Sequence, residues 1–422
     1  MEHLLFAAYL ILFAWLVTKV KFFKQSGLTS AQLIIFFFLK VLAGIFYGWI
    51  GVYYGELAQM VDTWGYHYES LKEYQLLLDD PSDFFSSLFK TTYDTGYSGF
   101  LTSGNSWWTD LKSNSLLKVL ALFNLFSFGN YYVNLVFFSF ITLFGPIAIY
   151  RVMKDIFPTK KMVVLAATFL VPSFLYWTSG IHKDGIIFLG FAMIIYHFYF
   201  LIKENKLQWH RLLMIILGAL LILALRNFLI VVFIPALTAW AISAKSNVSP
   251  WLSFAVVYVF FTVLFFTAKY AHPALDFPSA VTAKQQAFIA HTGGSVVEVK
   301  PLVPDFSGFV INAPQAFSLA VIRPYPNDVR HLLSLAAAIE VNFLILLFFA
   351  FLIWREKSTS INPFLLFCVF LSFSVLMMIG YTVNFLGAIV RYRSIVLPFL
   401  IVPMVARIDW SRIKSLTIDK LK

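Results

Sequence analysis

The sequence is poor in charged residues and nearly lacks cysteine. Charged side chains make up 13% of the 422 residues, whereas a soluble domain carries about a quarter. So few charges could not cover the surface of a soluble domain. The single cysteine, Cys368, excludes an intramolecular disulfide and a cysteine-based metal cluster. The sequence also contains neither a tandem repeat nor a low-complexity tract.

Apolar residues take the place of the missing charges. They form 60% of the chain, 48 of them are Phe, and the mean hydropathy is +0.80. A bilayer-spanning helix needs about 20 mostly apolar residues. We expect spans near residues 4–19, 32–54, 131–153, 162–178, 185–202, 211–225, 228–244, 251–269, 332–354, 364–383 and 390–407.

These segments predict an all-α, polytopic transmembrane helix bundle of about 10–12 spans, with residues 1–422 forming a single integral membrane domain. The apolar stretch Leu116–Phe128 is too short to span easily, and it predicts an interfacial or re-entrant helix. The stretch Leu4–Val17 is followed by lysines and lacks a small-residue cleavage site, so we do not expect a cleavable signal peptide.

The distribution of positive charge predicts the orientation. Lys and Arg are enriched in short cytoplasmic loops. If the loop after the first span is inside, the inner segments hold more than half of the 32 cations and a minority of the 21 acids. The N-terminus is then outside and the C-terminus cytoplasmic. Because the cations behind the net charge of +11 are scattered between spans, they indicate topology and not nucleic-acid binding.

Two long polar loops then face outward, over residues 55–115 and 270–330, and we expect short interfacial helices in both. Every inner loop is short. Because functional residues concentrate on long loops held by a rigid scaffold, the extracytoplasmic face is the expected working face.

The first outer loop opens with Asp62, followed by Tyr66 and His67. A carboxylate at this position is a candidate general base for an acceptor hydroxyl, or a metal ligand. Tyr66 and His67 are candidate substrate-binding residues. The alternative is that Asp62 only caps a helix or is a solvated loop acid.

A tight outer turn carries His182, Lys183 and Asp184. We expect it at the membrane surface, where Lys183 would bind a phosphate and His182 would donate a hydrogen bond or shuttle a proton. The alternative is an interface turn in which Asp184 caps the next helix. Arg226 and Asn227 interrupt another apolar stretch, at a turn on the same face. There Arg226 either pairs with an acid or is an interface arginine that snorkels to the headgroups.

Four further arginines fall on the outer side and are candidate phosphate or pyrophosphate ligands, since planar guanidinium groups bind these anions in a bidentate manner. Arg323 and Arg330 lie at the end of the second outer loop, where the alternative is a structural pairing with Asp328. Arg391 and Arg393 open the final span. Lys40 and Glu340 lie within spans, where they either pair or line a substrate path.

The same residues resemble a known family. Asp62-Thr-Trp-Gly-Tyr66-His67 resembles the D-x-x-x-Y-H signature in the first outer loop of polytopic bacterial glycosyltransferases of the GT-C type, which use polyprenyl-phosphate-linked sugars. Residues 176–184 are similar to a W-S-G-x-x-K-[DE] turn of uncharacterised relatives. Arg323-Pro-Tyr-Pro and Arg391-Tyr-Arg resemble closing motifs of that group. The acidic loop follows the second span and not the first, which resembles O-antigen and exopolysaccharide polymerases.

The resemblance implies a hexosyltransferase-like enzyme of cell-surface glycan assembly, in the plasma (bacterial inner) membrane. Asp62 would be the catalytic base, and His182, Lys183, Arg226, Arg391 and Arg393 would hold the lipid phosphate. The expected partners are membrane lipids, a polyprenyl-phosphate-linked sugar and a glycan acceptor, without nucleic acid. No cofactor is certain and no metal ligands are assigned, although a divalent cation is possible. The alternatives are an O-antigen or exopolysaccharide polymerase, and a lipid-linked glycan transporter or flippase.

Overall fold

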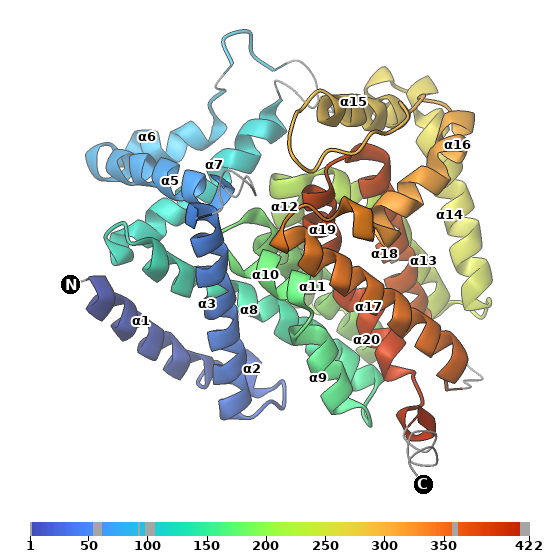
Figure 1. Ribbon diagram of the computed structural model, residues 1–422, viewed down its shortest axis with the longest axis horizontal. Coiled ribbons are helices and arrows are strands. Elements are labelled where there is room, and N and C mark those ends of the chain that lie inside the picture. The colour runs from blue at the N-terminus through green and yellow to red at the C-terminus, as the bar shows by residue number, and fades with distance from the viewer. Residues whose placement is uncertain (1, 54–60, 92, 98–105, 357–361, 414–422) are drawn as a thin grey trace. The chain divides into compact units, whose positions relative to one another are not determined.

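The computed structural model of the protein describes residues 2–53, 61–91, 93–97, 106–356 and 362–413 (Figure 1). These residues are mainly helical, and they contain no β-strand, although two isolated β-bridges occur. The all-α prediction is therefore confirmed. Two segments at or within the first predicted outer loop, residues 54–60 and 98–105, lie outside the described residues. The C-terminal residues from 414 onward do so as well.

Eight helices among the described residues are long and apolar enough to cross a bilayer. Two further pairs of shorter helices qualify only when each pair is taken as one bent span, with bends of 51° and 60°, which gives up to ten. The bent pairs correspond to the predicted spans at 162–178 and 390–407. The first predicted span is a helix of 16 residues, Glu2–Val17, shorter than the others. The polytopic prediction is thus confirmed, with eight to ten spans by length and composition.

The chain contacts divide the protein into two compact units, the first comprising Met1–Val152 and Phe174–Ile230, and the second Met153–Ser173 and Val231–Lys422. The helices of the first unit, some of which continue into the second, are α1 (Glu2–Val17), α2 (Lys21–Lys24), α3 (Ser30–Tyr53), α5 (Val61–Asp79), α6 (Pro81–Ser86), η1 (Ser87–Phe89), α7 (Trp107–Ser127), α8 (Tyr131–Ile156), α10 (Pro172–Ser179), α11 (Lys183–Glu204) and α12 (Trp209–Arg226).

The second unit contains α9, which forms a bent pair with α10, together with the remaining long apolar helices and several short helical turns. Its elements are α9 (Lys161–Phe169), α13 (Phe228–Lys245), α14 (Pro250–Thr267), η2 (Ala268–Tyr270), η3 (Pro273–Leu275), α15 (Phe277–Ile289), α16 (Phe306–Phe317), η4 (Ser318–Ile322), η5 (Pro326–Asp328), α17 (Leu332–Trp354), α18 (Pro363–Thr382), α19 (Leu386–Ser394) and α20 (Leu397–Ala406).

Local sequence signals set the helix boundaries. Ser106 and Asp305 cap α7 and α16, each accepting a hydrogen bond from a backbone N–H in the first turn. At the other end, Phe128 and Asn205 adopt left-handed backbone conformations that stop α7 and α11. The expected interfacial helix at 116–128 is the second half of the longer helix α7.

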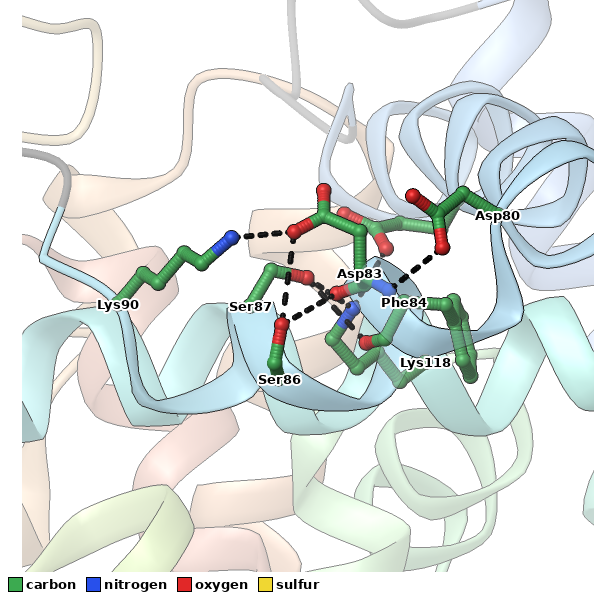
Figure 2. Close-up of polar contacts among 8 residues, drawn as sticks. Asp80, Asp83, Phe84, Ser86, Ser87, Lys90 and Lys118 are labelled. Carbon is green, nitrogen blue, oxygen red and sulfur yellow. Dashed lines mark hydrogen bonds and ion pairs between the residues drawn. The ribbon is translucent and has the colours of Figure 1, made fainter.

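The described part of the first predicted outer loop is mainly helical, and side-chain contacts connect its helices to one another. Lys118 of α7 forms an ion pair with Glu73 of α5 at 2.8 Å and donates to the Ser87 hydroxyl at 3.0 Å (Figure 2). Its ammonium group also lies 4.2 Å from the centre of the Phe84 ring of α6. Because Lys118 is buried, these contacts bind α5, α6 and α7 into one body, and Asp62 lies at the start of α5.

We expect cysteine labelling to confirm the orientation deduced from the basic residues. In a Cys368→Ser background, Glu298→Cys should react with a membrane-impermeant maleimide in intact cells, because Glu298 is exposed in the second predicted outer loop. Lys206→Cys, exposed between α11 and α12, should react only after permeabilisation. The reverse labelling pattern would invert the predicted orientation.

Candidate active site

Contacts with α3 and α8 fix the first turn of α5, which carries Asp62. The Trp64 indole N–H donates to the Gly48 carbonyl at 2.8 Å, and its ring stacks on Tyr131 with centroids 4.0 Å apart. The Thr63 hydroxyl shares a 2.8 Å hydrogen bond with the Tyr131 hydroxyl. Asp62 directly precedes these two anchoring residues, and its side chain stays 46% exposed. Asp62 is thus held rigidly while remaining open to a ligand.

The turn between α10 and α11 is held from α3. Lys40 donates to the Thr178 carbonyl at 2.6 Å, at the end of α10 where the helix carbonyls carry partial negative charge. Gly180 lies directly against the Tyr47 ring, which a Cβ at position 180 would overlap. Both contacts place the backbone just before His182, whose extended conformation (φ −160°, ψ 155°) begins α11.

Behind Asp62 lies a line of three charged or polar side chains, running from His182 to Asp184 and Arg226. His182 Nε2 lies 3.4 Å from Asp62 Oδ2, and His182 Nδ1 lies 2.9 Å from Asp184 Oδ2. Arg226 Nη2 lies 2.9 Å from the other oxygen of Asp184. His182 and Asp184 are fully buried. The position of this turn at the membrane surface stays a prediction; within the protein, His182 and Asp184 are covered by other side chains, whereas Asp62 is open.

Two groups face His182 Nδ1: the Asp184 backbone N–H at 3.3 Å, to which Nδ1 could only accept, and the Asp184 carboxylate oxygen at 2.9 Å. We assign a hydrogen to Nδ1, because the contact with the carboxylate is the shorter of the two. An ionised carboxylate only accepts hydrogen bonds. The contact between His182 Nε2 and Asp62 therefore requires a proton on one of the two. The pair can take up or release that proton, as general acid–base chemistry requires.

Positive charge collects beside this line. The Lys183 ammonium lies 5.0 Å from the centre of the Tyr66 ring, and that ring lies 6.0 Å from the His182 ring. Lys112 of α7 is a further cation that sequence reasoning missed: burial, and then repulsion from Arg226, lower the pKa of Lys112. Nothing in the sequence around Lys112 marks it, because Arg226, the cation that repels it, comes from a helix far along the chain.

His67 lies within an aromatic cluster and is buried. Its ring centroid is 5.5 Å from that of Tyr131, 5.6 Å from that of Tyr68 and 5.9 Å from that of Trp64. Burial lowers the pKa of His67 from 6.5 to about 4, so the ring is neutral near pH 7. Of the two neighbours predicted to bind substrate with Asp62, Tyr66 thus faces the charged residues and His67 packs among the aromatics.

In the second unit, two of the four predicted arginines meet. Arg393 of α19 is 3% exposed and donates from Nη1 to the Arg323 carbonyl at 2.6 Å. Arg323 lies 3.7 Å from Asp328, as the structural alternative expected, and its guanidinium lies 5.1 Å from the Tyr325 ring centre. Asp328 in turn accepts from the Tyr325 backbone N–H at 2.8 Å. The contacts of this cluster hold the chain around Arg323 in place, and its two arginines outnumber its one acid, Asp328.

The other two arginines have further contacts of their own. Arg330 is exposed and donates to the Gly294 carbonyl at 2.7 Å. Arg391 lies 5.6 Å from the ring centre of its neighbour Tyr392. Since residues two apart on a helix point in nearly opposite directions, Arg391 and Arg393 do not present a joint surface on α19.

The second unit also holds a cavity of about 410 Å³ between α9, α17 and α20. Its walls are apolar, except for Glu340. One carboxylate oxygen of Glu340 accepts from the Ser173 backbone N–H at 3.2 Å and from the Ser173 hydroxyl at 3.0 Å. Glu340, like Lys40, thus has a hydrogen-bonding partner within its own unit.

Among the residues that the structure describes, no group of three or more His, Cys, Asp or Glu side chains is placed to hold a metal ion. Asp62 and Asp184 contact opposite nitrogens of His182, so the imidazole ring separates the two carboxylates. A divalent cation stays a prediction from the sequence.

No protein-family model matches the chain, and comparisons with curated proteins and with solved structures found no match.

We expect the ion pair of Asp184 and Arg226 to be a main determinant of stability in the first unit. Either Asp184→Asn or Arg226→Gln should destabilise the protein by about 3–5 kcal/mol, because each leaves a buried charge without its partner. The double variant should recover about 1–3 kcal/mol of the summed loss. Denaturant unfolding in detergent measures all three, and single variants as stable as the unmodified protein would contradict the assignment.

We also expect His67 to make stability depend on pH. The unfolded chain takes up a proton at His67 near pH 6.5, whereas the folded chain does so only at about pH 4. The stability that neutral His67 provides is therefore present above pH 6.5 and lost as the pH falls from 6.5 towards 4. His67→Phe should flatten this part of the Tm–pH curve, and curves that stay parallel to those of the unmodified protein would contradict it.

Proposed function

We propose that the protein is a polytopic membrane glycosyltransferase that works on the extracytoplasmic face of the plasma membrane. Its donor would be a polyprenyl-phosphate-linked sugar, and its product a cell-surface glycan. The observation that supports this most is the exposed carboxylate of Asp62, coupled through the buried His182 to Asp184 and Arg226. A solvated loop acid or a simple helix cap would not need a buried histidine behind it.

The proposed reaction uses this line of residues as the base. The acceptor hydroxyl oxygen forms a bond with the anomeric carbon of the donor sugar, while the bond between that carbon and the phosphate oxygen breaks. Asp62 accepts the hydroxyl proton, which His182 shares at Nε2. Asp184 orients the imidazole ring and balances its positive charge when it is protonated. Polyprenyl phosphate leaves with the electron pair.

The leaving group carries growing negative charge, which nearby cations would stabilise. Lys183 is the best placed of the predicted ligands, because it lies beside Tyr66 and adjoins His182 in the chain. Arg226 is largely committed to Asp184, so its role is to hold that carboxylate. Arg323, Arg330, Arg391 and Arg393 stay predicted phosphate ligands, and the cluster of Arg323 and Arg393 is the stronger candidate of the second unit.

The two alternative functions are a flippase and a polymerase. A flippase would use Lys40 and Glu340, the charges within spans, along a substrate path, but both already have local hydrogen-bond partners, Thr178 and Ser173. A polymerase would use the same chemistry at Asp62 with a lipid-linked glycan chain as donor. Reconstituted vesicles separate transfer from transport: movement of the lipid-linked sugar across the bilayer without a new glycosidic bond would support the flippase.

Asp62→Asn should reduce surface glycan formation by about 100-fold or more, because it removes the proton acceptor while keeping the size of the side chain. The measurement is the surface glycan of producing cells at matched protein levels in the membrane. Asp79→Asn is the matched control: Asp79 is an exposed acid at the other end of α5, and its loss should leave the glycan unchanged. Normal glycan in the Asp62→Asn strain would contradict the proposal.

A further inference from the structure

A second cluster of positive charge lies in the first unit, where α8, α11 and α12 have their ends. The Arg151 guanidinium of α8 lies between two aromatic rings, 4.7 Å from the centre of Phe22 and 4.9 Å from that of Tyr196. The Arg211 guanidinium of α12 lies 5.4 Å from the centre of the Phe200 ring. Since Tyr196 and Phe200 are themselves in contact, with centroids 4.9 Å apart, a continuous aromatic surface supports both arginines. We call Arg151 and Arg211 the arginine cluster.

The acids near this cluster do not match its charge. Arg211 pairs with Glu204 at 2.7 Å and donates to Gln208 at 2.8 Å, but its Nη1 is buried without a hydrogen-bond partner in the described residues. Arg151 donates only a long bond, 3.4 Å, to the Phe22 carbonyl and forms no ion pair with an acid that the structure describes. Glu204 therefore balances the charge of Arg211 alone, and the cluster keeps a net positive charge among the described residues.

Two histidines extend the set of donors. The His197 ring of α11 lies 5.0 Å from Tyr196 and 6.4 Å from the His210 ring of α12. His197 Nδ1 is buried and has no hydrogen-bond partner among the described residues. Together with the arginines, these rings make a site with more hydrogen-bond donors than the described protein groups satisfy, which suits an anion rich in acceptors.

The position of the cluster favours a lipid as the source of that anion. All three helices are candidate spans, and the cluster lies near the C-terminal ends of α8 and α11 and at the start of α12. It is therefore expected at the level of the lipid headgroups, on the face that the basic residues assign to the cytoplasm.

We propose that the arginine cluster binds the phosphate of an anionic membrane phospholipid. Guanidinium groups provide N–H donors for phosphate oxygens, and the rings of Phe22, Tyr196 and Phe200 pack against the two guanidinium groups of the cluster. The site is independent of the chemistry proposed at Asp62, because it requires neither a sugar donor nor an acceptor.

The test compares lipids on the purified full-length chain in detergent, using native mass spectrometry for bound lipid and Tm for stabilisation. Phosphatidylglycerol should bind and raise Tm, while phosphatidylcholine and inorganic phosphate should give much smaller shifts. Arg151→Gln should lose at least half of the phosphatidylglycerol effect. Lys24→Gln, which removes an exposed charge of α2, is the matched control and should keep the full effect.

Glu204→Gln provides a test of opposite sign and stands even if Arg151→Gln does not fold. Removing the one acid that pairs with Arg211 should strengthen phosphatidylglycerol binding, whereas loss of a merely structural ion pair would not. Three results would overturn the proposal: an unchanged phosphatidylglycerol effect in Arg151→Gln, equal shifts from phosphatidylcholine, or equal shifts from inorganic phosphate, which would assign the site to soluble anions.

Discussion

The buried ion pair between Asp184 and Arg226 is the interaction on which the candidate site depends. A carboxylate with no exposed surface cannot stay ionised in an apolar bundle without a nearby positive charge. Arg226 provides that charge from the end of α12. Ionised Asp184 can then hold the His182 ring by its Nδ1–H, and the opposite nitrogen reaches Asp62. Without the ion pair, neither the tautomer of His182 nor its orientation would be fixed.

The chain order of these residues explains how the bundle supports the line. Asp62 begins α5, His182 and Asp184 begin α11, and Arg226 ends α12. Helices α11 and α12 are joined by a short turn and pack along each other, so their far ends return to the same level (Figure 1). Asp184 and Arg226, at those two ends, are therefore brought together by a simple helical hairpin.

Much of this could be predicted from the sequence, because apolar length alone reveals a membrane helix. The expected span at 332–354 matches α17, and the expected break at Arg226–Asn227 separates α12 from α13. The residues of the line were also all selected as candidates. The burial of His182 and Asp184 could not be predicted, because it depends on side chains of other helices, such as Tyr47 of α3 and Tyr66 of α5, that lie against His182.

Other features depend on partners that a single sequence cannot reveal. Lys40 bonds to a backbone carbonyl at the end of α10, a group present at every helix end and marked by no residue type. Lys112 gains its importance from Arg226, more than a hundred positions later. Aromatic stacking places Tyr66 and His67, neighbours in sequence, in different surroundings. Polar residues next to apolar runs can thus be identified as candidates, but their pairing requires the three-dimensional structure.

The close packing of α3 against the end of α10 has an evolutionary consequence. A Cβ at Gly44 would lie 2.7 Å from the Ser179 carbonyl oxygen, and one at Gly180 would overlap Tyr47. Neither position can accept a larger residue without shifting the turn that carries His182. Sequences too divergent for ordinary comparison can therefore be screened for a glycine at each of these two places, together with residues that match Asp62, His182, Asp184 and Arg226. That six-point pattern is a fingerprint by which homologues of this protein could be identified.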